Sequence, residues 1–563
     1  MKSIPSIPSI PRYPALGPER HLRLVDLHRR VIHPAKVAVE GDRIASIEPL
    51  PESAPLEPGF ILPGFVDAHV HIESSMLPPA EFARVAVRHG TVATVSDPHE
   101  IANVLGEEGV AFMLEEASRA CMPIAFGAPS CVPATSFERA GATLDLEAVE
   151  RLLADPRIPY LSEMMNWPGV LSGDPEVMAK IAAAKRLGKP IDGHAPGLRG
   201  ADAQRYADAG ISTDHECFTL EEAREKIAAG MKVLIREGSA ARNHDALWPI
   251  VHEHPDRVML CTDDTHPDAL VQGHLDRIVA RCLANGLDLF DVLRAACIAP
   301  VEHYALSTGL LRAGDRADFI VVDDLDSFRV RETWIAGRCV AREGRSLVEA
   351  TTPATPNRFR DARFDPMDFA LRVDREGPRT VRAIEVEDGE IVTGETSARI
   401  APRDGILEPD PASDTLLLTV CNRYEVAPPA LAFVRRIGLR HGAIASSVAH
   451  DSHNVVAAGA DRDSISAAVN AVFAAKGGLA VAHPGGVELL PLPIAGLMSD
   501  RPAEEVAAAY ERLTSIAQSL GSPLQAPFMT LSFLALLVIP ALKLGDRGLF
   551  DARAFGFVPA IAD

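Results

Sequence analysis

The stretch Pro63-Gly-Phe-Val-Asp-Ala-His-Val-His71 decides the fold of this chain. Its Pro-Gly pair predicts a turn, and the apolar residues that follow predict a short buried strand from Phe65 to Val70. Side chains two residues apart on a strand point to the same side, so His69 and His71 can face one metal ion. Because a single His-X-His pair often arises by chance, its meaning depends on the sequence that follows.

Eight strand-like apolar runs lie between His69 and Asp264, and helix-periodic stretches separate them. Such alternation over roughly 200 residues predicts an α/β fold, a (β/α)8 TIM-like barrel. A doubly wound sheet is the alternative, but it would normally bind its ligand through a glycine-rich turn, and neither GxGxxG after a strand nor GxxxxGK[ST] occurs. The runs are Phe65–Ile72, Thr91–Asp97, Ile124–Pro129, Tyr160–Met164, Pro190–His194, Ile211–His215, Lys232–Ile235 and Val258–Thr262. The helical stretches include Pro79–His89, Leu146–Leu153, Pro175–Leu187, Leu220–Ala229 and Asp268–Ala284.

Segments on both sides of the barrel predict further domains. The chain alternates like a hairpin around Gly41-Asp42, and strand-like runs return after the barrel, so the two segments are expected to pair into one small β domain. The last third predicts an α+β domain. The predicted division is a disordered lead-in over 1–17, a composite β domain over 18–60 and 306–350, the barrel over 61–305, a linker over 351–365 and the C-terminal domain over 366–563.

Composition narrows the classes of function. Lysine and arginine number 56 against 77 acidic residues, a net charge of −21, which argues against nucleic acid or an anionic membrane as a partner. The eight cysteines include no CxxC pair, so we expect reduced thiols in a cytoplasmic protein, and no signal peptide is evident. The most apolar run, Phe528–Leu542, is shorter than the roughly 20 residues of a membrane span and contains Pro540, so it predicts a buried helix.

Metal-ligand residue types stand at the C-terminal ends of the predicted strands, where barrel enzymes build their active sites. Any one histidine there could simply cap a backbone carbonyl, but six such residues at successive strand ends favour a metal site. Six nitrogen and oxygen ligands exceed the needs of one tetrahedral ion, so two ions bridged by Glu163 and a hydroxide are expected. The six are His69, His71, Glu163, His194, His215 and Asp263.

Three other polar clusters are candidates for contact with a substrate. The cluster after the second strand could instead form a turn that caps a helix. The cluster after the seventh strand could instead hold a structural Arg–Glu pair. The cluster in the last domain could close the site, hold a further ion or fix a turn. Their residues are Asp97, His99 and Glu100; Arg236, Glu237 and Ser239; and His450, Asp451, His453 and Asn454.

The chain closely resembles the adenine deaminases of the amidohydrolase superfamily from about residue 20 to its C-terminus. His-X-His belongs to the whole superfamily, whereas the longer strings are far more specific. These strings are PGFVDAHVHIESS (63–75), SDPHEIANV (96–104), PSCVPAT (129–135), EMMNWPGV (163–170), IDGHAPGL (191–198), STDHECFT (212–219), REGSA (236–240), CTDD (261–264), AHDSHN (449–454) and LPIAGLMSD (492–500).

The resemblance implies hydrolytic release of ammonia from free adenine, giving hypoxanthine, at a site with two divalent metal ions per chain. We expect manganese or iron rather than zinc, and a homo-oligomer, taken to be a dimer. Asp263 is the candidate for moving the proton of water to the exocyclic nitrogen. Asp97, His99 or Glu100 is expected to contact or protonate the purine ring, and the sequence does not choose among them.

Two other functions are compatible with parts of this pattern. The same metals could hydrolyse a cyclic amide or remove an acyl group, although the long strings after the second and fourth strands and the large C-terminal domain favour a deaminase. A metal-free barrel scaffold would be expected to lose ligands, and all six positions retain competent residue types. The PCxxC motif of cytidine-type zinc deaminases does not occur, which argues against action on nucleic-acid bases.

Overall fold

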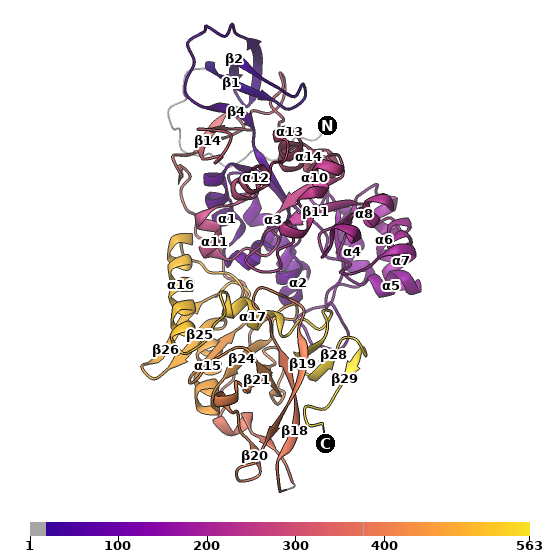
Figure 1. Cartoon of the computed structure of the whole chain (residues 1–563), viewed down its shortest axis with the longest axis vertical. Coiled ribbons are helices and arrows are strands. Elements are labelled where there is room, and N and C mark those ends of the chain that lie inside the picture. Colours follow the sequence, from indigo (N-terminus) through magenta and orange to yellow (C-terminus); the bar gives the residue numbers. More distant parts are fainter. Residues whose placement is uncertain (1–18, 375, 563) are drawn as a thin grey trace.

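The computed structural model describes residues 19–374 and 376–562, so the predicted disordered lead-in lies outside the described residues. Three bodies follow one another along the long axis of the molecule (Figure 1). A flanking sheet built from β1, β2, β4 and β14 among others lies at one end, the barrel helices surround the middle, and the C-terminal domain fills the other end.

Eight short parallel strands form the barrel, and the predicted (β/α)8 fold is confirmed. Hydrogen bonding divides them into sets of three, two and three strands. A bridge from Ala128 to Leu161 and a bond from the Ser212 amide to the Ile191 carbonyl (2.8 Å) join these sets. The strands are β5 (Phe65–Val70), β6 (Thr91–Ser96), β7 (Ile124–Phe126), β8 (Leu161–Met164), β9 (Ile191–Gly193), β10 (Thr213–Asp214), β11 (Lys232–Arg236) and β12 (Val258–Cys261).

The barrel closes between its last and first strands, directly beside the His-X-His stretch. The Asp263 amide donates to the His69 carbonyl (2.9 Å), and the His71 amide donates to the Asp263 carbonyl (3.2 Å). Asp263 has φ of 54°, a left-handed conformation that aspartate tolerates better than most residues. A Cβ on Gly64 would lie 2.2 Å from the Val92 side chain, so the turn before β5 requires glycine.

Helices cover the barrel as the sequence predicts, with one difference. The stretch Asp268–Ala284 is two helices, because the chain breaks at Gly273 and turns His274 inward. The His274 ring lies 2.7 Å from the Thr91 hydroxyl and 3.2 Å from Asp67. The helices are α1 (Pro79–Ala86), α2 (His99–Leu105), α3 (Glu107–Ala117), α4 (Leu146–Ala154), α5 (Trp167–Ser172), α6 (Pro175–Arg186), α7 (Gly200–Asp208), α8 (Leu220–Ala228), α9 (His244–Leu247), α10 (Pro249–Glu253), α11 (Pro267–Gln272), α12 (Leu275–Ala284), α13 (Leu289–Leu293) and α14 (Ala299–Tyr304).

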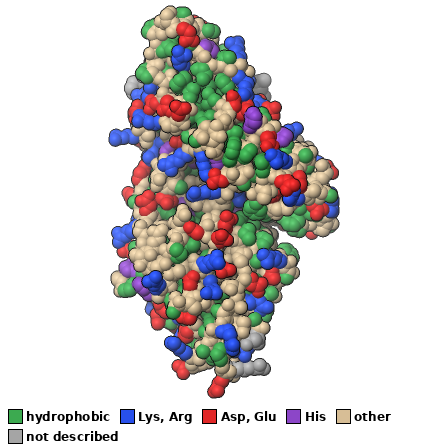
Figure 2. Space-filling view, in the orientation of Figure 1, with side chains coloured by type: hydrophobic (Ala, Val, Ile, Leu, Met, Phe, Trp, Pro, Cys, Tyr) green, Lys and Arg blue, Asp and Glu red, His purple; other side chains and the backbone are tan. Residues whose placement is uncertain are grey.

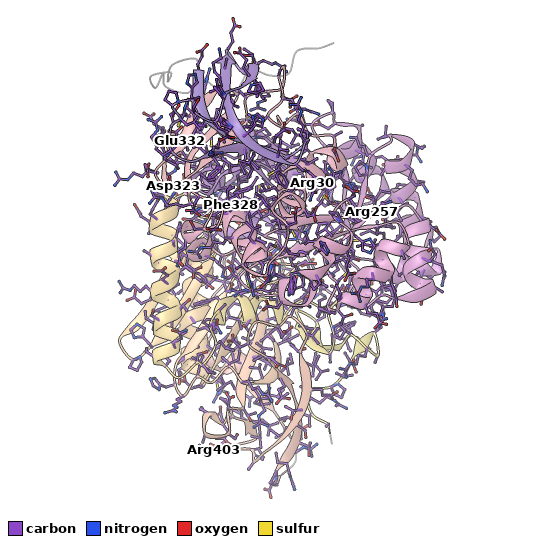
Figure 3. All side chains as sticks on the ribbon, turned by 45° about the horizontal axis from the view of Figure 1, so that its top comes forward. Arg30, Arg257, Asp323, Phe328, Glu332 and Arg403 are labelled. Atoms are coloured by element: carbon purple, nitrogen blue, oxygen red, sulfur yellow. The ribbon has the colours of Figure 1, made fainter. Side chains whose placement is uncertain are left out.

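The two segments that flank the barrel pair into one eight-stranded sheet. Strand β4 pairs with β13 in antiparallel register and with β1 in parallel register, which joins chain from before and after the barrel. Glu332, labelled in Figure 3, accepts a hydrogen bond from Arg20 of β1 (2.8 Å) across this sheet and one from the indole of Trp334 on its own strand (2.8 Å). Its order is β16 (Arg345–Ser346), β15 (Arg338–Arg342), β14 (Val330–Ile335), β13 (Phe319–Val322), β4 (Phe60–Pro63), β1 (Glu19–Asp26), β2 (Val31–Glu40) and β3 (Arg43–Pro49).

The C-terminal domain is built on a second eight-stranded sheet, on which α15 (Arg462–Ala474) packs. A small sheet of β27 (Leu542–Gly545), β28 (Gly548–Asp551) and β29 (Gly556–Phe557) packs against it, and α16 (Ala503–Ser519) contacts barrel helices α1 and α11. The large sheet runs β19 (Gly394–Ile400), β18 (Arg379–Glu385), β22 (Ala430–Arg435), β21 (Leu416–Cys421), β24 (Val455–Gly459), β23 (Ala443–Ser446), β25 (Gly478–His483) and β26 (Gly486–Pro491).

The prediction of one helix over Phe528–Leu542 is wrong in its second half. Helix α17 spans Pro527–Phe533, turns follow, and Leu542 begins β27. Pro540 disfavours helical backbone at the residue before it, and the pairing of β27 with β28 fixes the end of the run as a strand. The run is buried as expected, from Phe528 to Leu542 apart from the partly covered Val538 and Pro540.

Charge on the visible face of the molecule is mixed. Figure 2 shows Lys and Arg side chains dispersed among Asp and Glu side chains rather than gathered in one basic patch. Among the described residues, no helix has both the length and the apolar character needed to cross a membrane.

Candidate active site

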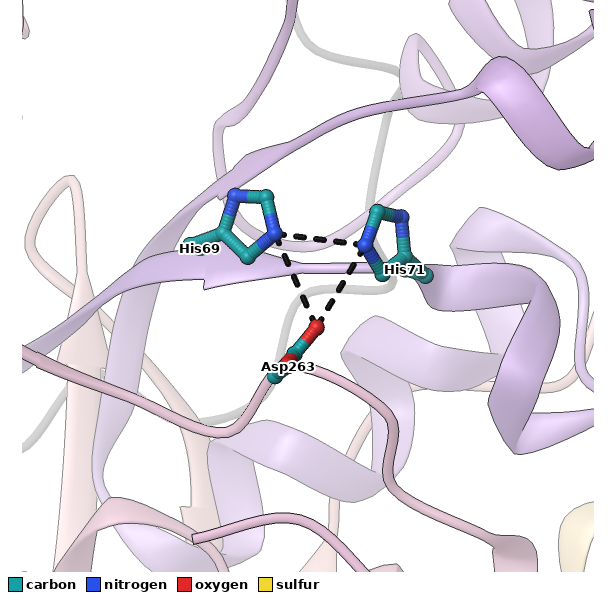
Figure 4. Close-up of side chains that lie close together, drawn as sticks. All are labelled: His69, His71 and Asp263. Carbon is teal, nitrogen blue, oxygen red and sulfur yellow. Dashed lines mark hydrogen bonds and ion pairs between the residues drawn. The ribbon is translucent and has the colours of Figure 1, made fainter. Parts of the chain in front are cut away.

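The first group of metal-ligand residues forms where β5 meets the end of β12. The Nε2 atoms of His69 and His71 lie 3.2 Å apart, and Asp263 Oδ1 lies 3.7 Å and 3.4 Å from them (Figure 4). Ligands about 2.0–2.1 Å from a tetrahedral ion lie roughly 3.3 Å from one another. The three side chains therefore have the spacing of ligands that share one cation.

Glu163, at the end of β8, divides its two oxygens between two sets of histidines. Oε1 lies 3.4 Å from His71 Nε2 and 3.2 Å from His99 Nδ1. Oε2 lies 2.9 Å from His194 Nδ1 and 3.2 Å from His215 Nε2. This is the geometry of a bridging carboxylate, with one oxygen for each of two ions. Burial alone would raise the pKa of Glu163, but the imidazoles of His194, His215 and His99 hold it well below its usual value.

A second group forms around His194 and His215, and it contains a carboxylate that sequence reasoning missed. Glu216 Oε1 lies 3.5 Å from His194 Nδ1 and 3.6 Å from His215 Nε2. Strand alternation would place adjacent side chains on opposite sides. However, β10 ends at Asp214, so His215 and Glu216 are no longer bound by that rule. The signal was present in the string STDHECFT, which carries the glutamate directly after the histidine.

Arg236 links the two groups from the end of β11. Its Nη1 donates to Asp263 Oδ2 (2.6 Å), and its guanidinium binds Glu216 through both terminal nitrogens, Nη2 at 2.8 Å from Oε2. Burial would raise the pKa of Asp263, but the Arg236 charge and the hydrogen bond from His71 hold it well below its usual value. Arg236 thus keeps Asp263 ionised and leaves its other oxygen facing the His69–His71 pair.

The donor set fits two divalent ions. All six expected ligands converge, and they are buried imidazoles and carboxylates, which suit zinc, iron or manganese. Within the described chain, His194 Nε2 and His99 Nδ1 are buried without a hydrogen-bond partner. Burial and the neighbouring His215 and His71 hold the pKa of His69 well below its usual value, so its ring is neutral. Burial also disfavours the charged form of His71, His194 and His215, but the carboxylates beside them raise the pKa of each ring, so these three must release a proton when they bind a cation.

The cluster after β6 meets the cluster of the C-terminal domain. Glu100 forms an ion pair with His450 Nδ1 (2.6 Å) through one oxygen and with His453 Nε2 through the other. His99 Nε2 lies 3.4 Å from Glu100 and 3.8 Å from Asp451. Two segments some 350 positions apart in sequence therefore build one buried polar network.

Two other members of these clusters, Asp97 and Asn454, lie outside the network and contact its residues or the turn that carries them. Asp97 Oδ1 accepts from the His99 amide (3.1 Å), and its Oδ2 lies 3.1 Å from His99 Nδ1 without a hydrogen bond, so Asp97 lies directly behind this ring. The Asn454 side chain accepts from the Arg423 amide (3.1 Å) and donates to the Arg139 carbonyl (2.9 Å). Asn454 therefore fixes the turn rather than facing the metal-ligand residues.

Two predicted substrate contacts lie elsewhere, and this corrects the expectation. Glu237 forms an ion pair with Arg281 on α12, and the Ser239 hydroxyl accepts from the His266 amide (2.9 Å). Neither residue lines the cavity described below. The chain leaves strand geometry after Arg236, so the residues that follow it turn toward the helical cover, and Arg236 alone of this cluster reaches the site.

A cavity opens onto these groups. Five of the six expected metal ligands line it, all except His69, and so do four residues of the buried polar network, His99, Glu100, His450 and Asp451. An apolar wall comes from the C-terminal domain and adjoins His450, on whose ring Phe533 stacks. The wall residues are Ile391, Phe533, Leu536 and Val538.

Comparison with known proteins agrees with this architecture. The model of the amidohydrolase family matches residues 60–340, and that of the adenine deaminase C-terminal domain matches residues 390–556. The adenine deaminase of Salinibacter ruber is 58% identical over 96% of this chain and 98% of its own length. Those of Methanosarcina mazei (51% identity, 96% and 99% coverage) and Sulfurovum sp. (53%, 95% and 98%) are similar over the same extent.

A (β/α)8 barrel that brings His-X-His, two further histidines, a glutamate and an aspartate together at its strand ends is an amidohydrolase, as the matching family model states. The full-length similarity, which includes the C-terminal domain, is more specific. The chain belongs to the adenine deaminase family.

Proposed function

We propose that the protein hydrolyses free adenine to hypoxanthine and ammonia. The observation that carries this proposal is the cavity itself, in which the candidate two-metal site lies beside a buried cluster of proton-carrying groups. Deamination at C6 needs a nucleophilic oxygen on one side of the ring and a proton donor on the other. The names of the relatives support adenine as the substrate.

We propose His69, His71, Glu163, His194, His215 and Asp263 as ligands of two divalent ions, with Glu163 as the bridge. When bound, the ions supply a water of lowered pKa as nucleophile. Manganese or iron is proposed rather than zinc. Elemental analysis of the purified protein, followed by chelation and reloading with each metal, tests the assignment. Two equivalents of metal per chain and activity restored first by Mn²⁺ or Fe²⁺ are expected.

Asp263 is proposed to carry the proton from the attacking water to the departing amino group. Its Oδ2 is bound to Arg236 while its Oδ1 faces the other proposed ligands, so the carboxylate lies beside the water that the ions would hold. The carboxylate is kept ionised in the resting state by that guanidinium, and it can therefore accept a proton.

The ring nitrogen N1 must gain a proton as C6 is attacked. His99 and Glu100 line the cavity, whereas Asp97 lies behind His99. We therefore propose that His99 or Glu100 contacts the purine, and that Asp97 orients His99. His450 and Asp451 are proposed as further contacts from the C-terminal domain, and His453 acts on the substrate only through Glu100.

A direct assay separates this function from the related hydrolysis of cyclic amides. Ammonia release from adenine is measured beside ring opening of dihydroorotate and hydantoin, with the same metal-loaded protein. Turnover of adenine alone is expected. Ring opening without ammonia release would refute the proposal. A cytoplasmic location and a homodimer stay predictions, and size measurement in solution tests the dimer.

A further inference from the structure

A buried lysine lies behind the apolar wall of the cavity. Lys543 is on β27, and its side chain has no exposed surface. Its Nζ donates to the backbone carbonyls of Ile391 (2.7 Å) and Phe533 (3.0 Å). These carbonyls belong to different segments of the C-terminal domain, the loop before β19 and the end of α17. One side chain therefore joins two segments that are 142 positions apart (533 − 391).

Both residues that Lys543 holds also line the cavity. The Phe533 ring stacks on the His450 ring, with centroids 4.8 Å apart and 19° between the planes. His450 in turn bonds Glu100. Ile391 and Phe533 pack in one apolar cluster with Ala241 of the barrel, whose amide donates to the Gly389 carbonyl (3.0 Å). The position of the wall is thus coupled to the polar side of the cavity.

The chemistry of Lys543 suits a side chain that joins two segments by hydrogen bonds. Burial lowers the pKa of its ammonium to about 7, so the neutral amine is a major form near neutral pH. A neutral amine has two N–H donors, and two carbonyls accept from it. An apolar residue here would remove one hydrogen bond from each carbonyl. The Phe533 carbonyl would still accept from the Leu536 amide (3.2 Å), so the larger loss falls on the Ile391 carbonyl.

We infer that Lys543 is a positioning residue for the substrate: it holds Ile391 and Phe533 in the wall against which the flat face of the purine packs. This inference rests on the proposed function. Lys543 touches neither the metal-ligand residues nor the proton-carrying cluster in the described contacts. Its loss is therefore expected to weaken adenine binding and leave the chemical step largely intact.

The test is steady-state kinetics of Lys543→Met, which keeps the length of the side chain and removes its donors. KM for adenine is expected to rise about tenfold, the effect of losing a well-placed pair of hydrogen bonds, with kcat within about twofold of wild type. Metal content should be unchanged. Lys189→Met is the matched control, because Lys189 also donates to backbone carbonyls (Leu153, Asp155 and Ile158), but at the opposite end of the barrel.

The control should lose stability without a change in KM. An unchanged KM in folded Lys543→Met, or an equal fall of kcat, would overturn the inference. If Lys543→Met does not fold, Phe533→Leu replaces it, since this change removes the ring and leaves the Lys543 bond to the carbonyl. A normal KM in Phe533→Leu would show that the wall does not contact adenine. A separate result would contradict the proposed function itself: wild-type protein that holds two metal ions but neither binds nor deaminates adenine. In that case the proposed role of Lys543 would also be rejected.

Discussion

The two halves of the cavity are built in different ways. On the barrel side, the metal-ligand residues stand at or just after the ends of β5, β8, β9, β10 and β12, and hydrogen bonds between parallel strands fix their backbones. On the C-terminal side, the lining residues lie in a loop, a turn and the end of a short helix. The first half has the regularity that exact ligand spacing requires. The second half encloses the cavity, and for the proposed planar substrate shape matters more than a repeated geometry.

The largest effect is expected from a substitution of Glu163, the proposed bridge in the barrel half of the cavity. Glu163→Gln keeps the shape of the side chain but replaces one oxygen with a nitrogen that cannot serve as a carboxylate ligand. We expect both ions to be lost or reduced and adenine turnover to become undetectable. Metal analysis and ammonia assays measure this, with Glu147→Gln on the exposed face of α4 as control. Two retained ions at full rate would remove Glu163 as the bridge.

A sharper test within the barrel half separates metal binding from proton transfer. Asp263→Asn retains an oxygen ligand beside His69 and His71 but cannot accept a proton. Most of the metal is expected to remain, while kcat falls roughly 10²–10⁴-fold, the usual contribution of a general acid–base group. A near-normal kcat would show that another group carries the proton.

The C-terminal half is tested through its polar contact with the barrel. His450→Gln removes the ring that bonds Glu100 and stacks on Phe533. We expect kcat/KM for adenine to fall about tenfold to a hundredfold, since a charge-assisted hydrogen bond and a wall contact are lost, with metal content unchanged. His441→Gln, an exposed histidine in the same domain, is the control. Equal kinetics in the two variants would make the C-terminal half structural only.

The smallest effect concerns stability rather than activity. The folded state lowers the pKa of Lys543 to about 7 from its usual 10.5, so it binds this proton less readily than the unfolded chain. Stability from this group therefore rises with pH between these two values and is constant below about pH 7. The melting temperature of the wild type minus that of Lys543→Met should increase as pH rises from about 7 to 9.5. A constant difference would indicate an unshifted lysine.

The same comparison explains which parts of the site could be predicted. The six proposed ligands were found because strand ends recur at regular intervals in a barrel, and residues such as His69 and His71 obey strand alternation. Glu216 was missed because strand alternation assigns it to the side opposite its neighbour His215, and Glu237 was misplaced because the chain turns toward the helical cover after Arg236. Once the backbone leaves the strand, the sequence no longer says which way a side chain points.

The amino-acid sequence by itself determined the barrel, the strand character of its flanking segments and the ligand types at the strand ends, because these follow from local periodicity and residue chemistry. Only the tertiary structure decided that Glu100 bonds His450 and His453, that Arg236 holds both Glu216 and Asp263, and that Lys543 supports the cavity wall. These contacts join segments far apart in the chain, so they depend on how domains pack, which no local pattern encodes.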